Sequence, residues 1–320
     1  MSVALVSLSS IHQLADSGQL IPVTHSEVQD MKIGFIGIGA IGYPMAERLL
    51  PHHDVTVFDL NRERVAELAT QGARTAATAA EATRESEVTI VMVATPEQLE
   101  AALFADDGVA AAARAGTTIL IMSSVGVAAA TAANDRLRTN GIIVVDAPVT
   151  GGVVRARSGE LTILLGGSPA EIDAVRPVLE CLGTRLAICG PSVGDGQAVK
   201  LVNQLLCSVH LAVAGEALSL AEALGLDPAA VLEIVGSGAA ASFMLNDRGP
   251  RMLEEQPAVL SAIDIFVKDS RLVQDAARAS RASTPILDAA AARFELAQTA
   301  GLGRSDDSAV LHTYRHPVHN

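Results

Sequence analysis

Three polar residues in one predicted helix have the types and the spacing to move a proton. Lys200, Asn203 and Gln204 are three and four positions apart, so they share one face of an α-helix. A lysine whose pKa is lowered by burial or by a nearby cation can carry a proton, and an amide beside it can orient a reacting oxygen. By spacing alone, a solvent-exposed lysine with its stem on the surface is the commoner outcome, so both interpretations stay open.

A second candidate is the stretch DAPVTGG, which covers residues 146–152 and ends a predicted strand in two glycines. Successive backbone N–H groups in such a segment can hold a carboxylate. An ordinary Gly-Gly turn would have the same sequence, and the stretch by itself favours neither.

A third candidate is a glycine-rich loop between a predicted strand and a predicted helix. Its residues are Gly37, Ile38, Gly39, Ala40, Ile41 and Gly42. In such a pattern Gly37 permits the tight turn, Gly39 lets a pyrophosphate approach the backbone, and Gly42 lets helix and strand pack closely. Asp59, at the end of the next strand, is positioned to accept hydrogen bonds from the ribose of NAD, whereas Arg62 could tolerate NADP. The alternative is a glycine-rich turn without a ligand.

Four separated stretches resemble the β-hydroxyacid dehydrogenases, such as 3-hydroxyisobutyrate dehydrogenase and tartronate semialdehyde reductase. They are IGFIGIGAIGYPMA, DAPVTGGVVRARSGELTILLGG, GDGQAVKLVNQ and FVKDSRLVQDA. With SRASTPIL and SDDSAV, the resemblance covers Met31 to about Tyr314. One motif could arise by chance, but four in the family's order are specific.

The resemblance implies roles that spacing could not assign. Lys200 matches the catalytic lysine, and Asn203 and Gln204 match residues that hold the substrate, with Gln204 as in tartronate semialdehyde reductases. Further implied substrate contacts are Thr150, Gly151, Gly152 and Phe243, and further implied cofactor contacts are Val93, Ala94, Gln98, Ser124 and Lys268. The chain departs from the family pattern at Ile41 (a common methionine), Arg48 (asparagine) and Thr150 (serine).

The resemblance implies an NAD(P)-dependent oxidoreductase. It would transfer a hydride between a nicotinamide cofactor and a short β-hydroxy acid, with Lys200 as general acid and base. Its site would lie between two domains whose closure excludes water. Alternatives are an imine reductase, which usually has another residue in place of the lysine, and a dinucleotide-binding module without catalysis. A decarboxylating phosphogluconate enzyme would need a longer helical domain and a basic pocket. The sequence does not identify the hydroxy acid or the physiological direction.

The pattern of elements predicts an α/β chain in three segments. Residues 1–30 form an N-terminal extension outside the fold, residues 31–192 a Rossmann NAD(P)-binding domain, and residues 193–320 an all-helical substrate and dimerisation domain. The predicted strands are KIGFIG, DVTVFD, VTIVMVA, TTILIM, IIVVDAPV, LTILLGG and RLAIC, which alternate with helices and predict a parallel sheet covered on both faces. Glycines predicted to end helices in the left-handed region are Gly72, Gly116, Gly141 and Gly183. Helix breaks are predicted near 225–228, 236–238, 249–250, 257 and 285.

Composition restricts the partners and the compartment. The net charge of −13 argues against nucleic acid or an anionic membrane as partner. Three cysteines without CxxC spacing predict a reducing, cytoplasmic location and no zinc site. No apolar run reaches the roughly 20 residues of a membrane span. We expect no metal, because His312, His316 and His319 are best interpreted as a solvated tail.

The segment 199–224 is apolar around much of its helical circumference. A helix of this kind is normally buried on all sides, which predicts a homodimer or homotetramer joined through the helical domain. The family resemblance implies the same. The alternative is that a single chain buries the helix.

Overall fold

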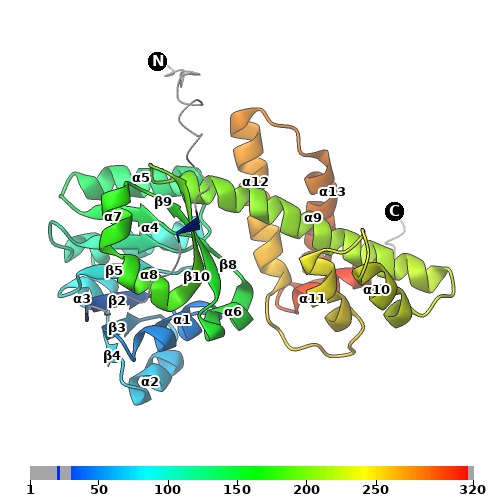
Figure 1. Cartoon of the computed structure of the whole chain (residues 1–320), viewed down its shortest axis with the longest axis horizontal. Helices are drawn as coiled ribbons and strands as arrows, with labels where there is room; N and C mark the ends of the chain where they lie inside the picture. Colours follow the sequence, from blue (N-terminus) through cyan, green and yellow to red (C-terminus); the bar gives the residue numbers. More distant parts are fainter. Residues whose placement is uncertain (1–19, 22–29, 316–320) are drawn as a thin grey trace. The chain divides into compact units, whose positions relative to one another are not determined.

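The structure, a computed structural model, describes residues 30–315 and the backbone of residues 20–21. His316, His319 and most of the predicted extension 1–30 lie outside the described residues. Contacts divide the chain into two compact units, the first ending at Lys200 and the second beginning at Leu201. Figure 1 shows the whole chain with its elements labelled.

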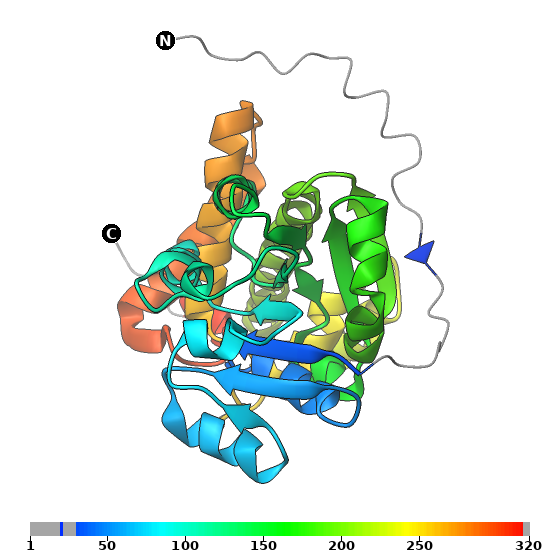
Figure 2. The same cartoon turned by 90° about the vertical axis from the view of Figure 1, so that its left-hand side faces the viewer.

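The first unit is built on one mixed sheet in the order β1-β10-β9-β7-β6-β5-β2-β3-β4, with β8 paired to β9. The strands are β1 (Leu20–Ile21), β2 (Lys32–Ile36), β3 (Asp54–Phe58), β4 (Arg74–Thr75), β5 (Val88–Val91), β6 (Thr118–Ile121), β7 (Ile143–Asp146), β8 (Val149–Thr150), β9 (Leu161–Gly166) and β10 (Gly183–Gly190). Figure 2 shows the neighbouring strands β2 and β3, which pair in parallel.

Two expectations about the sheet are wrong. β9 runs antiparallel to β7 and β8, so the sheet is not wholly parallel. A strand buried on both faces has the same apolar sequence in either direction, so periodicity could not reveal this. Residues 20–21 do not lie outside the fold, because β1 pairs antiparallel with β10. β1 therefore covers a sheet edge that would otherwise be open.

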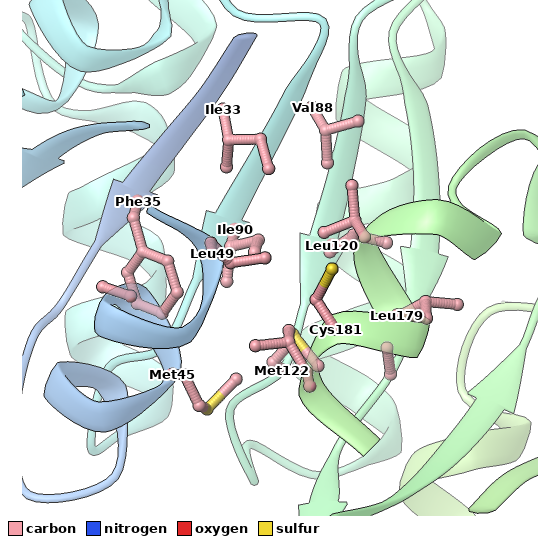
Figure 3. Close-up of a cluster of buried hydrophobic side chains, with 14 of the residues drawn as sticks. Ile33, Phe35, Met45, Leu49, Val88, Ile90, Leu120, Met122, Leu179 and Cys181 are labelled. Atoms are coloured by element: carbon pink, nitrogen blue, oxygen red, sulfur yellow. The ribbon is translucent and has the colours of Figure 1, made fainter. Parts of the chain in front are cut away.

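Helices cover both faces of the sheet, as predicted. The helices of the first unit are α1 (Gly42–Leu49), α2 (Arg62–Thr70), α3 (Ala79–Thr83), α4 (Pro96–Phe104), α5 (Val127–Arg138), α6 (Gly152–Ser158), α7 (Pro169–Ala174) and α8 (Arg176–Leu182), with a 3-10 turn at Val109–Ala111. Alternate residues of a strand face opposite sides. Phe35 of β2 belongs to the buried cluster that also contains Met45 of α1 and Leu179 of α8 (Figure 3), whereas Ile36 belongs to the cluster on the side of α3 to α5.

The glycines before strands play two different roles. Gly72, Gly116 and Gly141 have positive φ, as predicted for helix ends. Gly183 has φ −151, so its prediction as a left-handed cap is wrong. A Cβ at Gly183 would lie 2.4 Å from the carbonyl oxygen of Leu161 in β9. Gly183 is therefore required by the close approach of two strands.

In its described residues, the named elements of the second unit are all helices, and one isolated β-bridge pairs Ala262 with Asp306. Its elements are α9 (Asp195–Ala223), which begins in the first unit, α10 (Pro228–Gly236), α11 (Phe243–Met252), α12 (Ile263–Ser280), α13 (Pro285–Ala297), a π-helical turn η3 (Gln298–Leu302), a 3-10 helix η4 (Asp307–Leu311) and α14 (His312–Arg315). The predicted break at 249–250 is wrong, because α11 continues through Pro250. Pro250 has no N–H to donate to the carbonyl oxygen of Asn246, and the helix ends two residues later.

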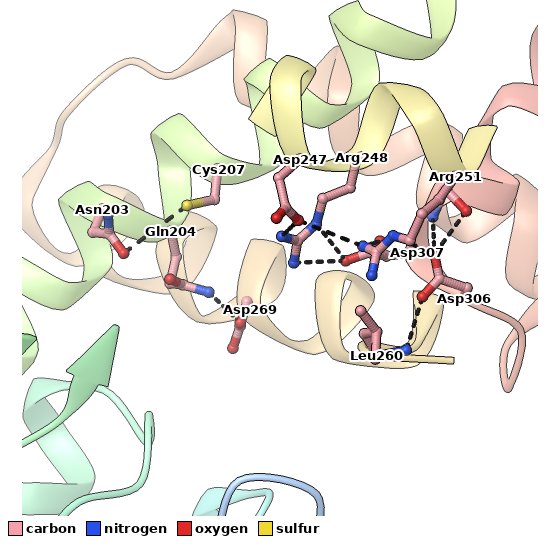
Figure 4. A network of polar contacts seen from close by, with 11 residues as sticks. Asn203, Gln204, Cys207, Asp247, Arg248, Arg251, Leu260, Asp269, Asp306 and Asp307 are labelled. Atoms are coloured by element: carbon pink, nitrogen blue, oxygen red, sulfur yellow. Dashed lines mark hydrogen bonds and ion pairs between the residues drawn. The ribbon is translucent and has the colours of Figure 1, made fainter. Parts of the chain in front are cut away.

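A buried ion cluster ties α11 to η4 in the second unit. Arg251 contacts Asp307 at 3.1 Å and Asp306 at 3.4 Å, and Arg248 contacts Asp307 at 3.2 Å (Figure 4). Asp306 also accepts a hydrogen bond from the backbone N–H of Leu260 at 3.0 Å. The aspartates of the SDDSAV stretch thus hold α11 and the segment at Leu260 together within the second unit.

The long helix α9 is unevenly buried. Leu211 and Leu218 are buried in the core of the second unit, whereas Val202, Val213 and Leu220 are 63 %, 52 % and 58 % exposed. By length and composition alone, α9 is apolar enough to cross a membrane, although its sequence has no continuous apolar run of about 20 residues. The core helix of a soluble protein can meet the same criteria. In α9, 44 % of the 18-residue window that meets them is buried. The finding is weak evidence for a membrane span.

Candidate functional site

The glycine-rich loop has the geometry that a dinucleotide requires. Gly37 has φ +90, and a Cβ there would lie 2.4 Å from the carbonyl oxygen of Met92. A Cβ at Gly42 would lie 2.2 Å from the carbonyl oxygen of Gly37, whereas one at Gly39 meets no atom within 4 Å. Two of the glycines are thus needed by the fold, and Gly39 leaves open space beside the loop. That space is where a pyrophosphate could approach the backbone.

Asp59 follows β3 and faces the glycine-rich loop. Its carboxylate accepts hydrogen bonds from the backbone N–H groups of Ile38 and Asn61, both at 2.7 Å. Arg62 donates to the carbonyl oxygens of Ala76 and Ala77 at 3.2 and 2.9 Å. The guanidinium of Arg62 is therefore engaged away from the loop. Arg64 donates to the carbonyl oxygen of Ile38 at 3.1 Å, so a carboxylate and a guanidinium both contact the glycine-rich loop.

The loops after β5 and β6 are joined by a serine that the sequence analysis did not identify. Ser123 accepts a hydrogen bond from the backbone N–H of Val93 at 2.7 Å and lies beside Ser124 in the chain. Gln98, on α4, accepts from the backbone N–H of Ala94 at 2.8 Å. The four residues predicted to contact the nicotinamide half thus lie at the carboxyl ends of two adjacent parallel strands, where such ligands bind in open α/β sheets.

The predicted carboxylate loop has two successive left-handed residues. Thr150 ends β8 and pairs with Thr162 of β9, and Gly151 and Gly152 follow with φ +136 and +69. A Cβ at Gly151 would lie 2.8 Å from Cδ of Arg155. Both positions therefore favour glycine because of their positive φ. This holds for an anion-binding segment and for an ordinary turn alike, so it does not distinguish the two interpretations.

Lys200 is buried, with 7 % of its surface exposed. The interpretation of this residue as a solvated surface lysine is therefore wrong, since fully buried lysines are rare unless they are paired. Asn203, half-buried, follows three positions later on α9, and Gln204, buried, follows four positions later. One helix face thus carries an ammonium group and two amides.

Sequence reasoning missed two buried residues, Asp146 at the end of β7 and Gln197 in the first turn of α9. The Asp146 carboxylate accepts from the backbone N–H groups of Gly194 and Gln197 at 3.1 and 2.8 Å and from the Gln197 side chain at 2.9 Å. Burial raises the pKa of Asp146 to about 6, against the hydrogen bonds that lower it. The DAPVTGG and GDGQ motifs contain both residues, and an aspartate at the end of a strand buried on both faces was the available signal.

In the second unit, Gln204 and Lys268 share one partner. Gln204 donates through its amide nitrogen to Asp269 (Figure 4). The Lys268 ammonium lies 2.8 Å from the other carboxylate oxygen of Asp269. Asp269 is only 3 % exposed, so this carboxylate holds a predicted substrate residue and a predicted cofactor residue together. Phe243 begins α11 with 59 % of its surface exposed, and no contact tests its predicted place in the substrate pocket.

The chain uses lysine sparingly. Its 23 basic residues include only three lysines, Lys32, Lys200 and Lys268, and the rest are arginines. Arginine stays protonated in proteins, so it cannot carry a proton, whereas lysine can. Two of the three lysines thus occupy predicted functional positions. Among residues 30–315, no three His, Cys, Asp or Glu side chains group to hold a metal.

Comparisons with known proteins identify the family to which the chain belongs. Residues 32–190 match the family described as the NAD-binding domain of 6-phosphogluconate dehydrogenase, and residues 194–314 match the NAD-binding family of NADP-dependent 3-hydroxyisobutyrate dehydrogenase. The chain is 38 % identical to an L-threonate dehydrogenase of Cupriavidus necator over 280 residues, which covers 87 % of this chain and 94 % of that protein.

Solved structures show the same relationship. A 3-hydroxyisobutyrate dehydrogenase from Salmonella typhimurium has a TM-score of 0.83 and 33 % identity, covering 88 % of this chain and 99 % of the other. A Streptomyces aurantiacus imine reductase has a TM-score of 0.61 and 21 % identity, covering 89 % of this chain and 99 % of the other, and shares the fold alone. With both parts of the chain matched and relatives above 30 % identity over most of its length, the chain belongs to the β-hydroxyacid dehydrogenase family and is an NAD(P)-dependent oxidoreductase acting on CH–OH groups.

Proposed function

We propose that this enzyme oxidises a short, polar β-hydroxy acid with NAD, and that Lys200 is its general base. The observation that carries the proposal is a buried lysine on the same helix face as two amides, Asn203 and Gln204. The imine-reductase alternative has less support, because the lysine is present and the similarity to such enzymes extends to the fold only.

The dinucleotide would be held by the glycine-rich loop through Gly39, by Asp59, and by the loops that carry Val93 and Ser124. When bound, it supplies the carbon that accepts or donates the hydride. The open space at Gly39 and the carboxylate of Asp59 beside the same loop fit such a group.

Groups of this chain transfer the substrate's proton and bind its carboxylate. Lys200 in its neutral form takes the proton of the substrate hydroxyl, and in the reverse direction its ammonium form returns it. The Thr150–Gly152 segment receives the substrate carboxylate on its backbone N–H groups. Asp269 holds the amide nitrogen of Gln204, which leaves the amide oxygen as the group that would accept a hydrogen bond from a substrate hydroxyl.

L-Threonate is the first substrate to test. The support is the similarity to L-threonate dehydrogenase, together with two amide side chains on the lysine face that suit a substrate with more than one hydroxyl. A panel should include 3-hydroxyisobutyrate and L-serine, each with NAD and NADP, and tartronate semialdehyde, the reverse-direction substrate, with NADH and NADPH. Reduction of a cyclic imine without turnover of any hydroxy acid would contradict the proposal.

The role of Lys200 is tested by Lys200→Ala and Lys200→Arg. Loss of a general base costs about 10²- to 10⁴-fold in rate, and arginine should not restore it because it cannot be deprotonated. NADH binding, followed by its fluorescence, should be retained. The matched control is Lys32→Ala, at an exposed lysine of β2 that should leave turnover unchanged. Near-normal turnover in Lys200→Ala would contradict the mechanism.

We also propose that the enzyme is a cytoplasmic homo-oligomer, a dimer or a tetramer, joined through α9. The support is the row of exposed apolar side chains, Val202, Val213 and Leu220, on that helix. Val213→Glu should lower the mass measured by light scattering. Leu60→Glu, at a residue 87 % exposed in the first unit, is the control that should not. A monomer mass for the parent protein across a dilution series would contradict this proposal.

A further inference from the structure

The Gln197 side chain has every hydrogen-bonding position filled. Its amide nitrogen donates to the carbonyl oxygen of Ser123 and to Asp146, both at 2.9 Å. Its amide oxygen accepts from the backbone N–H groups of Val125 and Gly126, both at 3.0 Å. A carboxamide has two N–H groups and two acceptor positions, so no alternative orientation of this amide satisfies the same partners.

These contacts join three segments of the first unit. Ser123, Val125 and Gly126 follow β6, Asp146 ends β7, and Gln197 lies in the first turn of α9. The approach is close, because a Cβ at the neighbouring Gly196 would lie 2.9 Å from Asp146 and 2.4 Å from the carbonyl oxygen of Leu164. Gln197 is 1 % exposed and Asp146 is fully buried. Buried, fully satisfied polar networks hold a single arrangement, since any displacement leaves a group unpaired.

We infer that Gln197 and Asp146 are positioning residues for the proposed reaction, which fix the start of α9 and thereby the place of Lys200. Lys200 lies three residues after Gln197, less than one helical turn away. The same amide holds the loop that begins beside Ser124, and Asp146 begins the segment that leads to Thr150. The Gln197–Asp146 pair thus fixes the relative positions of Lys200, the loop after β6 that carries Ser124, and the Thr150–Gly152 segment. The inference rests on the proposed function for its effect on turnover.

Gln197→Glu tests the inference with little change in shape. It places a carboxylate oxygen against Asp146 and the Ser123 carbonyl, both acceptors. We expect turnover of the best substrate to fall about 100-fold, as expected when a reacting group is misplaced by about 1 Å. We expect the NADH dissociation constant to change less than about threefold. Asp146→Asn in the Gln197→Glu background should recover part of the loss, because the asparagine can donate to the new carboxylate.

The matched control is Gln274→Glu. Gln274 on α12 also donates to an aspartate, Asp288, at 2.8 Å, but this pair is exposed to solvent. The substitution therefore adds the same charge beside the same kind of partner, without the buried network. We expect turnover close to that of the parent enzyme.

A second readout does not depend on turnover. With only three lysines, protein labelled with 13C at lysine Cε should give three resonances, which the lysine variants assign. Gln197→Glu should shift the Lys200 resonance and leave those of Lys32 and Lys268 in place. If Gln197→Glu does not fold, the neutral Gln197→Asn, one methylene shorter, should give the same selective shift.

The two readouts separate the two proposals. A Lys200 resonance that moves, in an enzyme that turns over no hydroxy acid, would leave the positioning role standing and contradict the proposed function. An unmoved Lys200 resonance with parental turnover in a folded Gln197 variant would overturn the inference. An equal loss of turnover in Gln274→Glu would also overturn it.

Discussion

Gly39→Ala should weaken dinucleotide binding without weakening the fold. A Cβ at this position meets no atom of the chain within 4 Å, and Gly39 is not among the glycines with positive φ. A glycine-to-alanine change in such a conformation raises the unfolding free energy by about 0.4–1 kcal/mol, because the unfolded chain loses freedom. The added methyl group would occupy the space that we assign to the pyrophosphate.

The size of the binding effect follows from the hydrogen bonds at risk. Displacing a phosphate from one backbone N–H costs about 1.5–3 kcal/mol, the value for a hydrogen bond to a charged group. That corresponds to an increase of about 10- to 150-fold in the NADH dissociation constant. The assays are a fluorescence titration with NADH and urea unfolding of the same preparation. Unchanged affinity for NADH, or a clear loss of stability, would refute the assignment of this space.

Two further glycine variants give the comparison for Gly39→Ala, one expected to be neutral and one expected to destabilise the fold. Gly238→Ala is the control, because its Cβ would have its nearest neighbour at 4.0 Å and Gly238 has no positive φ. It should change neither affinity nor stability. Gly42→Ala should lower stability by about 1–3 kcal/mol, the usual cost of overpacking, since its Cβ would lie 2.2 Å from the carbonyl oxygen of Gly37.

Three other predictions concern specificity, pH and the sheet. Asp59→Asn should improve kcat/KM with NADP relative to NAD, because a ribose phosphate would no longer meet a carboxylate; an unchanged ratio would show that Asp59 does not select the cofactor. Burial raises the pKa of Asp307 to about 6, above its ordinary 3.8, so the folded state binds the proton more tightly than the unfolded state. Its contribution to the unfolding free energy should therefore fall by about 3 kcal/mol as the pH rises from about 4 to above 6, and urea unfolding of the parent and Asp307→Asn across this range should show the difference. Gly183→Ala should lower the unfolding free energy by about 1–3 kcal/mol, because its Cβ would meet Leu161 of β9; parental stability would contradict the close approach.

The elements that the sequence predicts well are those whose signal is local. Long apolar runs such as Ile33–Ile36 and Val88–Val91 are strands because both of their faces are buried. The glycine-rich loop and Asp59 are predicted because tight turns and ribose contacts require particular residue types at particular distances. Lys200 is predicted as a candidate by type and spacing, but its burial comes from tertiary packing, which spacing does not contain.

The features that the sequence does not reveal depend on distant partners. The direction of β9 follows from its pairing with β8, a strand of only two residues, Val149–Thr150. Gly183 is preceded by a helix like the other glycines, and only the backbone of Leu161 distinguishes it. Asp269 and Gln197 are polar residues in helices, where most polar side chains are exposed. Each becomes a candidate only when its buried partner is known.

The continuity of α9 has a consequence for how this chain can evolve. The helix spans 29 residues, about 44 Å at 1.5 Å per residue, and carries Lys200 near its start and the buried Leu211 and Leu218 farther along. One residue inserted between Lys200 and Leu211 would rotate the two stretches by about 100° about the helix axis. Either the lysine face or the core face would then point the wrong way, whereas seven inserted residues would restore the angle to within about 20°. Surface loops away from the proposed site tolerate changes in length. The interval from Lys200 to Leu211 does not, and single-residue insertions or deletions there should be absent from functional variants selected in a random library.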